Sequence, residues 1–350
     1  MSREFRVLIA EDQIMARKAI IRELELIKDL KLSWTVCESA KKAHDKLDES
    51  AKTGQQYDFL FVDIDFTEDG RGGKRDSGFG IIEKAFNICP ISTISTYSAQ
   101  YNYLDLSPRH NELMNQGLIV YVYDKRHQEE DPADWFRSKF IAQINDITSN
   151  DFLWDIWNNH NLINQFVERT KLSTDDEEDE IKKAEIKQNL EAIIVLLKKR
   201  KLFNADEVVF RLIIQLYHRC LEVYCAEDKD PATIKQQSED NRQAAENLLG
   251  WHFERGLGSD DSALRKLIAF SPEEKLRHGY RLNSLRNKSV HPDLDFKLTM
   301  SNILFANLAL TMYASPFKKD IKFDKIEQFG NTNNDKGLNH LTDAIRFIRK

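Results

Sequence analysis

Residues 59–66 read FLFVDIDF, which is the strongest strand signature in the chain. The stretch starts with four apolar residues, and short apolar runs of this kind are typical of strands buried within a parallel sheet. Its second half carries two aspartates, Asp63 and Asp65. Ligands of open parallel sheets bind beyond the carboxyl ends of the strands, so the fold around this stretch decides what these carboxylates can do.

The N-terminal half alternates strand and helix patterns around this central strand. Short apolar or β-branched runs predict four further strands, at residues 5–10, 32–37, 91–97 and 118–123. Apolar residues at helical spacing predict helices at residues 14–27, 41–47, 80–88 and 135–147. This alternation favours an α/β domain over residues 1–148, with a five-stranded parallel sheet covered by helices on both faces.

The C-terminal half has helical patterns almost throughout. Residues 149–182 are expected to form a connecting helix and the acidic segment STDDEEDE, which is either a solvated linker or the start of the next helix. Residues 183–315 are predicted to form an all-α bundle, and residues 316–350 a tail with a short helix. Helical spacing and capping signals place these helices at about 186–197, 206–225, 239–253, 271–291, 296–313 and 338–348.

Composition excludes several classes of protein. The chain has 350 residues, with 51 Lys and Arg against 57 Asp and Glu, which gives a formal net charge of -6. Neither half is strongly basic, so broad charge-driven binding to nucleic acid is not expected, and no DNA partner is predicted. No apolar run is long enough to span a membrane. The four cysteines lack the spacing of a zinc site. We therefore expect a cytoplasmic protein with no membrane partner.

Polar residues lie at the carboxyl ends of four predicted strands. They are Glu11 and Asp12, Asp63, Ser98 and Lys125, and all five would meet at one edge of the sheet. Oxygen ligands from the three acidic residues suit a hard divalent cation such as Mg²⁺. With the cation and Lys125 screening negative charge, Asp63 could accept a phosphoryl group as an acyl phosphate. Ser98 could then bond one of the phosphate oxygens.

These motifs resemble the receiver domains of two-component response regulators. The matching stretches are LIAEDQ (8–13), FLFVDIDF (59–66), TYSA (96–99) and VYVYDK (120–125). The resemblance implies a flavodoxin-like fold, Mg²⁺ as cofactor, and phosphorylation by a cognate histidine kinase or another phosphodonor. It also implies a role for each residue: metal ligands Glu11, Asp12 and Asp63, phospho-acceptor Asp63, switch hydroxyl Ser98, phosphate contact Lys125, and switch aromatic Tyr123, for which Tyr121 competes.

Two departures from the receiver pattern leave alternatives open. The loop at residues 67–77 is several residues longer than is usual in that family, and Arg126 rather than proline follows Lys125. A degenerate receiver used for docking or dimerisation would also fit these residues. So would a domain that senses a small ligand such as a nucleotide. Asp65 is either exposed to solvent or a supporting metal ligand.

A second motif lies in the helical half, where residues 285–292 read LRNKSVHP. Arg286 and His291 form an R-x4-H arrangement, with Asn287 directly after the arginine. This spacing, the all-helical pattern and residues 206–225 resemble HEPN ribonuclease domains, including those of CRISPR-associated ribonucleases. The resemblance implies metal-independent RNA cleavage, with no cofactor, by Arg286, Asn287 and His291.

The residue types suit that chemistry. Histidine moves protons near neutral pH, and the arginine guanidinium stabilises charge that develops on a phosphate. Asn287 could orient the imidazole or hold the phosphate. On a helix, two residues that are five positions apart differ in direction by a net angle of roughly 140°. One helix therefore does not present Arg286 and His291 on one face. This favours a composite site at the two-fold axis of a homodimer. Alternatively, Arg286 caps a helix end, His291 is a surface residue, and the bundle is not catalytic.

The sequence therefore predicts a phosphorylation-regulated response regulator whose output is a HEPN-type endoribonuclease. It would act on RNA as a homodimer, and a role in antiviral defence would fit such a ribonuclease. The alternative is a signalling adaptor without catalysis, in which the receiver is phosphorylated and the helical module binds a protein.

Overall fold

The computed structural model divides the chain into two compact units, residues 1–150 and 151–350. The structure describes residues 3–66, 76–98, 107–125, 133–169, 172, 175–198, 205–226, 278, 281–282, 285, 288, 297–314, 318–333 and 335–350. The predicted helix at 239–253 and most of the one at 271–291 lie outside these residues.

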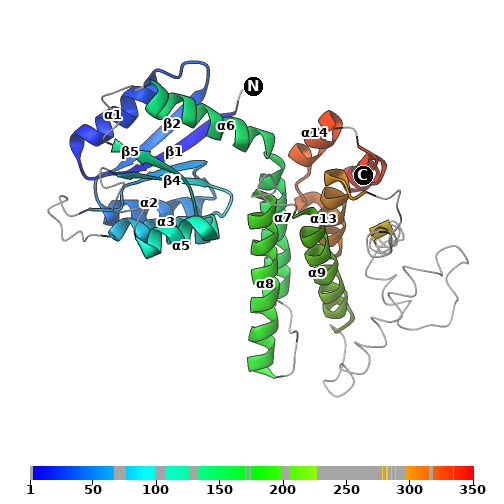
Figure 1. The fold of residues 1–350 in the computed structure, drawn as a ribbon. Helices are drawn as coiled ribbons and strands as arrows, with labels where there is room; N and C mark the ends of the chain where they lie inside the picture. Colours follow the sequence, from blue (N-terminus) through cyan, green and yellow to red (C-terminus); the bar gives the residue numbers. More distant parts are fainter. Residues whose placement is uncertain are drawn as a thin grey trace, which may run out of the picture. The chain divides into compact units, whose positions relative to one another are not determined.

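The first unit is a five-stranded parallel sheet with helices on both faces (Figure 1). The strand order is β2-β1-β3-β4-β5, and each strand runs parallel to its neighbours. The prediction of a parallel five-stranded sheet followed by a helical half is confirmed. The strands are β1 (Glu4–Ala10), β2 (Lys31–Cys37), β3 (Phe59–Val62), β4 (Thr93–Ser98) and β5 (Ile119–Asp124).

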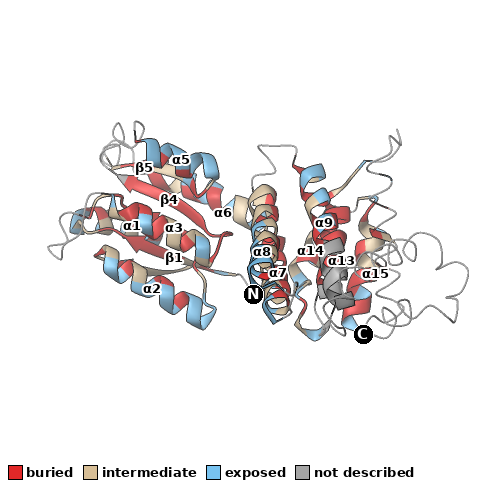
Figure 2. Cartoon of the chain, turned by 90° about the horizontal axis from the view of Figure 1, so that it is seen from below, coloured by how far each residue is buried: buried red, intermediate tan, exposed pale blue. Residues whose placement is uncertain are grey.

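Two apolar cores fill the space between the sheet and its helices. Helices α2 (Ala40–Thr53), α3 (Ser77–Ile88) and α5 (Pro108–Gln116) cover one face of the sheet. Helix α1 (Ile14–Glu25), the π-helical segment η3 (Ala133–Ser138) and α6 (Lys139–Ser149) cover the other. Because side chains alternate along a strand, the residues of β1 enter the two cores in turn. Figure 2 shows the strands buried between helices whose outer surfaces are exposed. This double burial explains why the central strand β3 is apolar without interruption.

The central strand is shorter than its apolar run suggested. β3 ends at Val62, although the predicted strand extended to residue 66. Ile64 and Phe66 remain buried beyond the strand, so the second half of the run packs into the core as irregular backbone. Asp63 therefore stands immediately after the last residue of β3.

Helix α5 was not predicted. Its local signals are nevertheless clear: the Ser107 hydroxyl oxygen accepts the His110 N–H (3.4 Å), Pro108 is the first helical residue, and Gly117 ends the helix with a φ of 78°. Proline at a helix start and glycine after its end form a recognised pair of boundary signals. The helix is short and only two of its residues are buried, so helical spacing alone did not reveal it.

The described part of the second unit is helical. Helix α13 has buried side chains at every position from Met300 to Met312, and it packs against α7, α9 and α15. A helix that is buried on all sides lies at the centre of a bundle. The helices are α7 (Phe152–Arg169), α8 (Asp176–Lys198), α9 (Asp206–Ala226), α13 (Met300–Ala314), α14 (Asp324–Asn333) and α15 (Leu338–Arg349), with a 3₁₀ turn η5 (Lys318–Asp320).

Polar residues on α7 hold the backbone that leads into α14. The side chain of Asn159 donates to the carbonyl oxygen of Lys322 and accepts its N–H, both at 2.8 Å. One oxygen of Asp155 accepts the N–H groups of Lys325 (2.7 Å) and Ile326 (3.0 Å). These N–H groups belong to the first turn of α14, where a helix has no internal acceptors. Asp155 thus caps α14 from a helix that is distant in the sequence.

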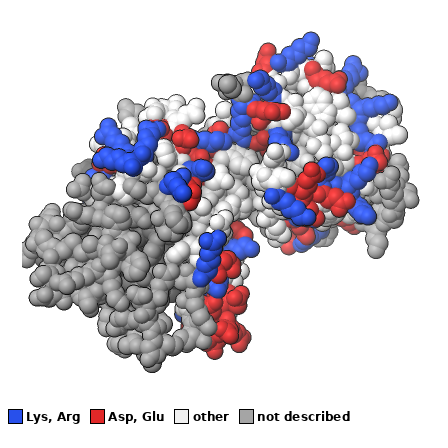
Figure 3. All heavy atoms as spheres, turned by 180° about the vertical axis from the view of Figure 1, so that it is seen from behind, with Lys and Arg blue, Asp and Glu red and all other residues white. Residues whose placement is uncertain are grey.

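The acidic segment belongs largely to α8. Asp175 accepts the N–H groups of Glu177 (2.9 Å) and Glu178 (3.0 Å), and the helix begins at Asp176. Negative charge is favourable at a helix N-terminus, which explains why this acidic run starts a helix. Figure 3 shows a group of acidic side chains at the lower end of the face in view, where α8 begins, and intermixed basic and acidic side chains over the rest of the described surface. None of the described helices is both long and apolar enough to cross a bilayer.

Candidate functional site

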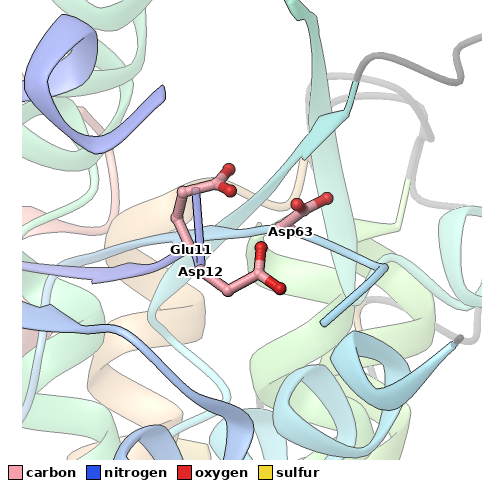
Figure 4. A group of neighbouring side chains, drawn as sticks. All are labelled: Glu11, Asp12 and Asp63. Atoms are coloured by element: carbon pink, nitrogen blue, oxygen red, sulfur yellow. The ribbon is translucent and has the colours of Figure 1, made fainter. Parts of the chain in front are cut away.

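Three carboxylates converge at the carboxyl edge of the sheet. Glu11 and Asp12 follow β1, and Asp63 follows its neighbour β3. Figure 4 shows the three side chains pointing toward one another. One oxygen of each lies within 4.8 Å of the others, and Glu11 and Asp63 are buried. Adjacent parallel strands that end side by side thus bring together residues more than fifty positions apart in the chain.

Lys125 joins this group from the end of β5. Its Nζ lies 2.6 Å from Oε2 of Glu11 and 2.7 Å from Oδ2 of Asp63. Only 8% of its side chain is exposed, so the ammonium is largely withdrawn from water. Ion pairs in such surroundings are screened much less than surface pairs.

The loop that carries the acidic pair is tied to α1. One terminal nitrogen of the Arg17 guanidinium donates to the carbonyl oxygens of Glu11 and Asp12, each at 2.8 Å. The N–H of Gln13 donates to Oε1 of Glu11 at 3.0 Å. These contacts fix the backbone of both acidic residues and the direction of the Glu11 carboxylate.

The two oxygens of Asp63 have different partners. Oδ1 accepts the N–H of Ile64 at 2.8 Å, whereas Oδ2 faces Lys125. Behind the aspartate, Gly78 at the start of α3 donates its N–H to the carbonyl oxygen of Ile64 at 3.0 Å. A Cβ atom on Gly78 would lie 2.0 Å from the carbonyl oxygen of Asp63, so no other residue fits there without a shift. The close packing of α3 therefore sets the position of Asp63.

Burial and charge shift the pKa values of this group. Burial, together with the charge of Asp63, raises the pKa of Glu11 to about 8. Burial also raises the pKa of Asp63, against the opposing effect of Lys125. For Lys125, burial alone would lower the pKa, but the charges of Asp63 and Glu11 outweigh it and raise the value. One ammonium thus faces two carboxylates that resist being ionised together.

The remaining predicted residues of the N-terminal site lie in different surroundings. Ser98 is the last residue of β4, opposite Asp124 of β5, and its side chain lies outside the described part of the structure. Tyr123 is fully buried, and its hydroxyl oxygen accepts a hydrogen bond from the Gln143 side chain. The competing Tyr121 is only partly buried. Asp65 is half-buried and does not belong to the carboxylate group described above.

Tyr97 is a neighbour of the site that sequence reasoning missed. Lys125 Nζ lies 4.8 Å from the centroid of its ring. The available signal was its position directly before Ser98 at the end of β4. Because side chains alternate along a strand, Tyr97 faces the core on the side of α1 and η3.

The donor set fits a divalent cation. Carboxylate oxygens are the ligands that Mg²⁺ prefers, and Glu11, Asp12 and Asp63 can each direct one oxygen to a common point. Because burial raises the pKa of Glu11, a cation would have to displace the proton of this carboxyl group on binding. No family model matches this chain, and no curated protein matches it either.

The predicted residues of the ribonuclease motif, Arg286, Asn287 and His291, lie outside the described residues. The nearest described positions are Leu285 and Lys288, both helical. Leu285 is buried and Lys288 is exposed.

Proposed function

We propose that the protein is a phosphorylation-regulated response regulator in which Asp63 accepts a phosphoryl group. The observation that supports this proposal is the meeting of Glu11, Asp12 and Asp63 with the ammonium of Lys125, which lies 2.7 Å from the Asp63 carboxylate. An anionic phosphodonor can approach a carboxylate only where positive charge offsets the repulsion. Lys125 supplies such charge, and Mg²⁺ bound by the three carboxylates would supply more.

Each residue of the site would have its own role in phosphoryl transfer. An oxygen of Asp63 attacks phosphorus and forms an acyl phosphate, while the bond between phosphorus and the donor breaks and the leaving group keeps its electron pair. The N–H of Ile64 holds the other carboxylate oxygen in place. Lys125 then pairs with the phosphate oxygens, and the Ser98 hydroxyl at the end of β4 donates to them.

Phosphoryl transfer to Asp63 is tested on the full chain with acetyl phosphate and Mg²⁺. We expect the intact mass to show one acid-labile phosphoryl group when Mg²⁺ is present, and none when the metal is chelated before the donor is added. Asp63→Asn should abolish the gain. Asp65→Asn, which removes a carboxylate two residues away, should retain it. Equal labelling of Asp63→Asn and the wild type would exclude Asp63 as the acceptor.

We further propose that the helical unit is a HEPN-type endoribonuclease output, acting on RNA as a cytoplasmic homodimer in antiviral defence. The support is the Arg286–His291 spacing within a unit whose described residues are helical. Arg286 would stabilise charge on the scissile phosphate, His291 would move the proton, and Asn287 would orient the histidine or hold the phosphate. Phosphorylation of Asp63 would change cleavage only if it stabilises one state of the molecule more than another.

Cleavage is tested with labelled RNA in the presence of EDTA. We expect the wild type to cut RNA, and Arg286→Ala and His291→Ala each to be inactive. Arg346→Ala, which removes an exposed arginine of α15, should cut as the wild type does. If every variant and the wild type leave RNA intact, while beryllofluoride changes dimerisation or binding of a protein, the helical unit is a non-catalytic binding module.

A further inference from the structure

Tyr97 lies beside the proposed acceptor site without being one of its ligands. Its side chain is fully buried, and its ring packs against Trp135 of η3 at a centroid distance of 5.6 Å. Lys125 Nζ lies 4.8 Å from the centroid of the Tyr97 ring. An ammonium within about 6 Å of an aromatic ring centroid is attracted by the negative face of the ring. Lys125 therefore has an aromatic partner in addition to its two carboxylates.

The aromatic contact differs from the carboxylate contacts in one respect. The attraction of Glu11 and Asp63 for the ammonium weakens whenever a carboxylate is protonated or is engaged by another cation. The ring carries no proton that titrates in the working range, because burial raises the pKa of the Tyr97 phenol well above its ordinary value. Its attraction for Lys125 therefore does not depend on the charge of the two carboxylates, as long as Lys125 carries its proton.

We propose that Tyr97 is a positioning residue, whose ring face holds the ammonium of Lys125 beside Asp63. The contact itself stands on the geometry, whereas its consequence for phosphoryl transfer rests on the proposed function. A neutral ring fixes the ammonium without adding negative charge. A third carboxylate at the same place would repel an incoming phosphoryl group. Because the lysine stem is long and flexible, such a contact limits where Nζ can move.

The contact is tested by the reactivity of the Lys125 amine in the full chain. Trace acetylation with acetic anhydride, followed by mass spectrometry of the peptide that contains Lys125, reports how often Nζ leaves its partners. We expect Tyr97→Leu to raise the labelling rate about tenfold and Tyr97→Phe to change it by less than about twofold. Phe136→Leu is the matched control, since Phe136 is fully buried in the same aromatic cluster and packs against Trp135. It should leave the labelling rate unchanged.

A graded series separates ring electrostatics from packing if Tyr97→Leu does not fold. Phenylalanine analogues with one, two or three ring fluorines at position 97 keep the shape of the ring but withdraw charge from its face. Labelling of Lys125 should rise stepwise with the number of fluorines. A flat series, or equal effects of Tyr97→Leu and Phe136→Leu, would overturn the proposal.

Phosphoryl transfer supplies the second measurement. Tyr97→Leu should slow phosphorylation of Asp63 by acetyl phosphate by about tenfold, and Tyr97→Phe should restore the wild-type rate. Faster labelling of Lys125 without slower phosphorylation would show that transfer does not use the contact, which overturns the positioning role. If the wild type accepts no phosphoryl group, the proposed function fails, and the labelling of Lys125 still decides whether Tyr97 holds it.

Discussion

Gly78 shows how a residue without a side chain can set the position of the proposed acceptor. A Cβ atom there would lie 2.0 Å from the carbonyl oxygen of Asp63, whereas a Cβ on Gly80, one half-turn later in α3, would meet only the His44 ring at 3.9 Å. We expect Gly78→Ala to lower the free energy of unfolding by about 1–3 kcal/mol through overpacking. Gly80→Ala should be neutral or stabilising by up to about 1 kcal/mol. Urea unfolding of both variants measures the difference, and equal stabilities would contradict the close approach.

Glu11 gives the stability of the protein a defined pH dependence. Its pKa is about 8 in the folded chain, against an ordinary value of 4.5. The folded state therefore binds this proton more tightly than the unfolded chain, so the associated stability is complete below about pH 4.5 and is lost as the pH rises through 8. Over this window the free energy of unfolding should fall by roughly 4–5 kcal/mol more in the wild type than in Glu11→Gln, which cannot ionise. Urea unfolding at a series of pH values gives the two slopes.

Mg²⁺ provides the control for this interpretation. A cation that binds ionised carboxylates should restore stability to the wild type near pH 8 and have a smaller effect near pH 5, where Glu11 holds its proton. Glu11→Gln should respond weakly at both pH values. Identical pH slopes with and without Glu11 would mean that its carboxylate ionises freely in the folded protein.

Two adjacent asparagines on α7 differ in burial and can be compared directly. Asn159 exchanges two hydrogen bonds with the backbone of Lys322, whereas Asn158 is exposed. We expect Asn159→Ala to cost about 1–3 kcal/mol, because it leaves a backbone N–H and carbonyl without their partner. It should also speed hydrogen exchange in the segment leading into α14. Asn158→Ala should change stability by less than about 0.5 kcal/mol. Similar exchange rates in both variants would refute this anchoring role.

The sheet could be predicted from the sequence because its inner strands, such as β1 and β3, are buried on both faces. Runs such as FLFV in β3 stand out against any surface segment. Strand ends and the short helix α5 were less visible, since Ile64 and Phe66 stay apolar after β3 has ended. The capping of α14 by Asp155 could not be predicted, because Asp155 precedes the two residues that it caps by 170 and 171 positions in the sequence.

The same contrast holds for the candidate site. That Glu11, Asp12, Asp63 and Lys125 meet at one edge followed from their places at the ends of parallel strands. Their distances, the burial of Lys125 and its contact with Tyr97 depend on the packing of whole side chains, on which strand order gives no information. The roles assigned to these residues, and to Arg286, Asn287 and His291, stay predictions until the experiments above are done.

The two units of the chain should unfold as separate transitions. Both apolar cores of the sheet unit draw every member from residues 1–150. A domain with its own core can fold alone, so we expect a fragment of residues 1–150 to be folded. Its urea midpoint should match one of two transitions in the full chain, followed by circular dichroism and by tryptophan fluorescence. A fragment that lacks cooperative unfolding would show that the sheet unit needs the helical unit.

The hydrogen bonds between α7 and residues 322–326 have a consequence for the synthesis of the protein. The side chains of Asp155 and Asn159 leave the ribosome more than 160 residues before the backbone groups that they bind. The sheet unit holds all of its own core and can fold while the rest of the chain is still being translated, since domains generally fold as units, N-terminal first. The helical unit cannot form these hydrogen bonds until residues 322–326 have been synthesised. A chain whose synthesis stops within α13 would therefore have a folded sheet unit and a helical unit that lacks these hydrogen bonds.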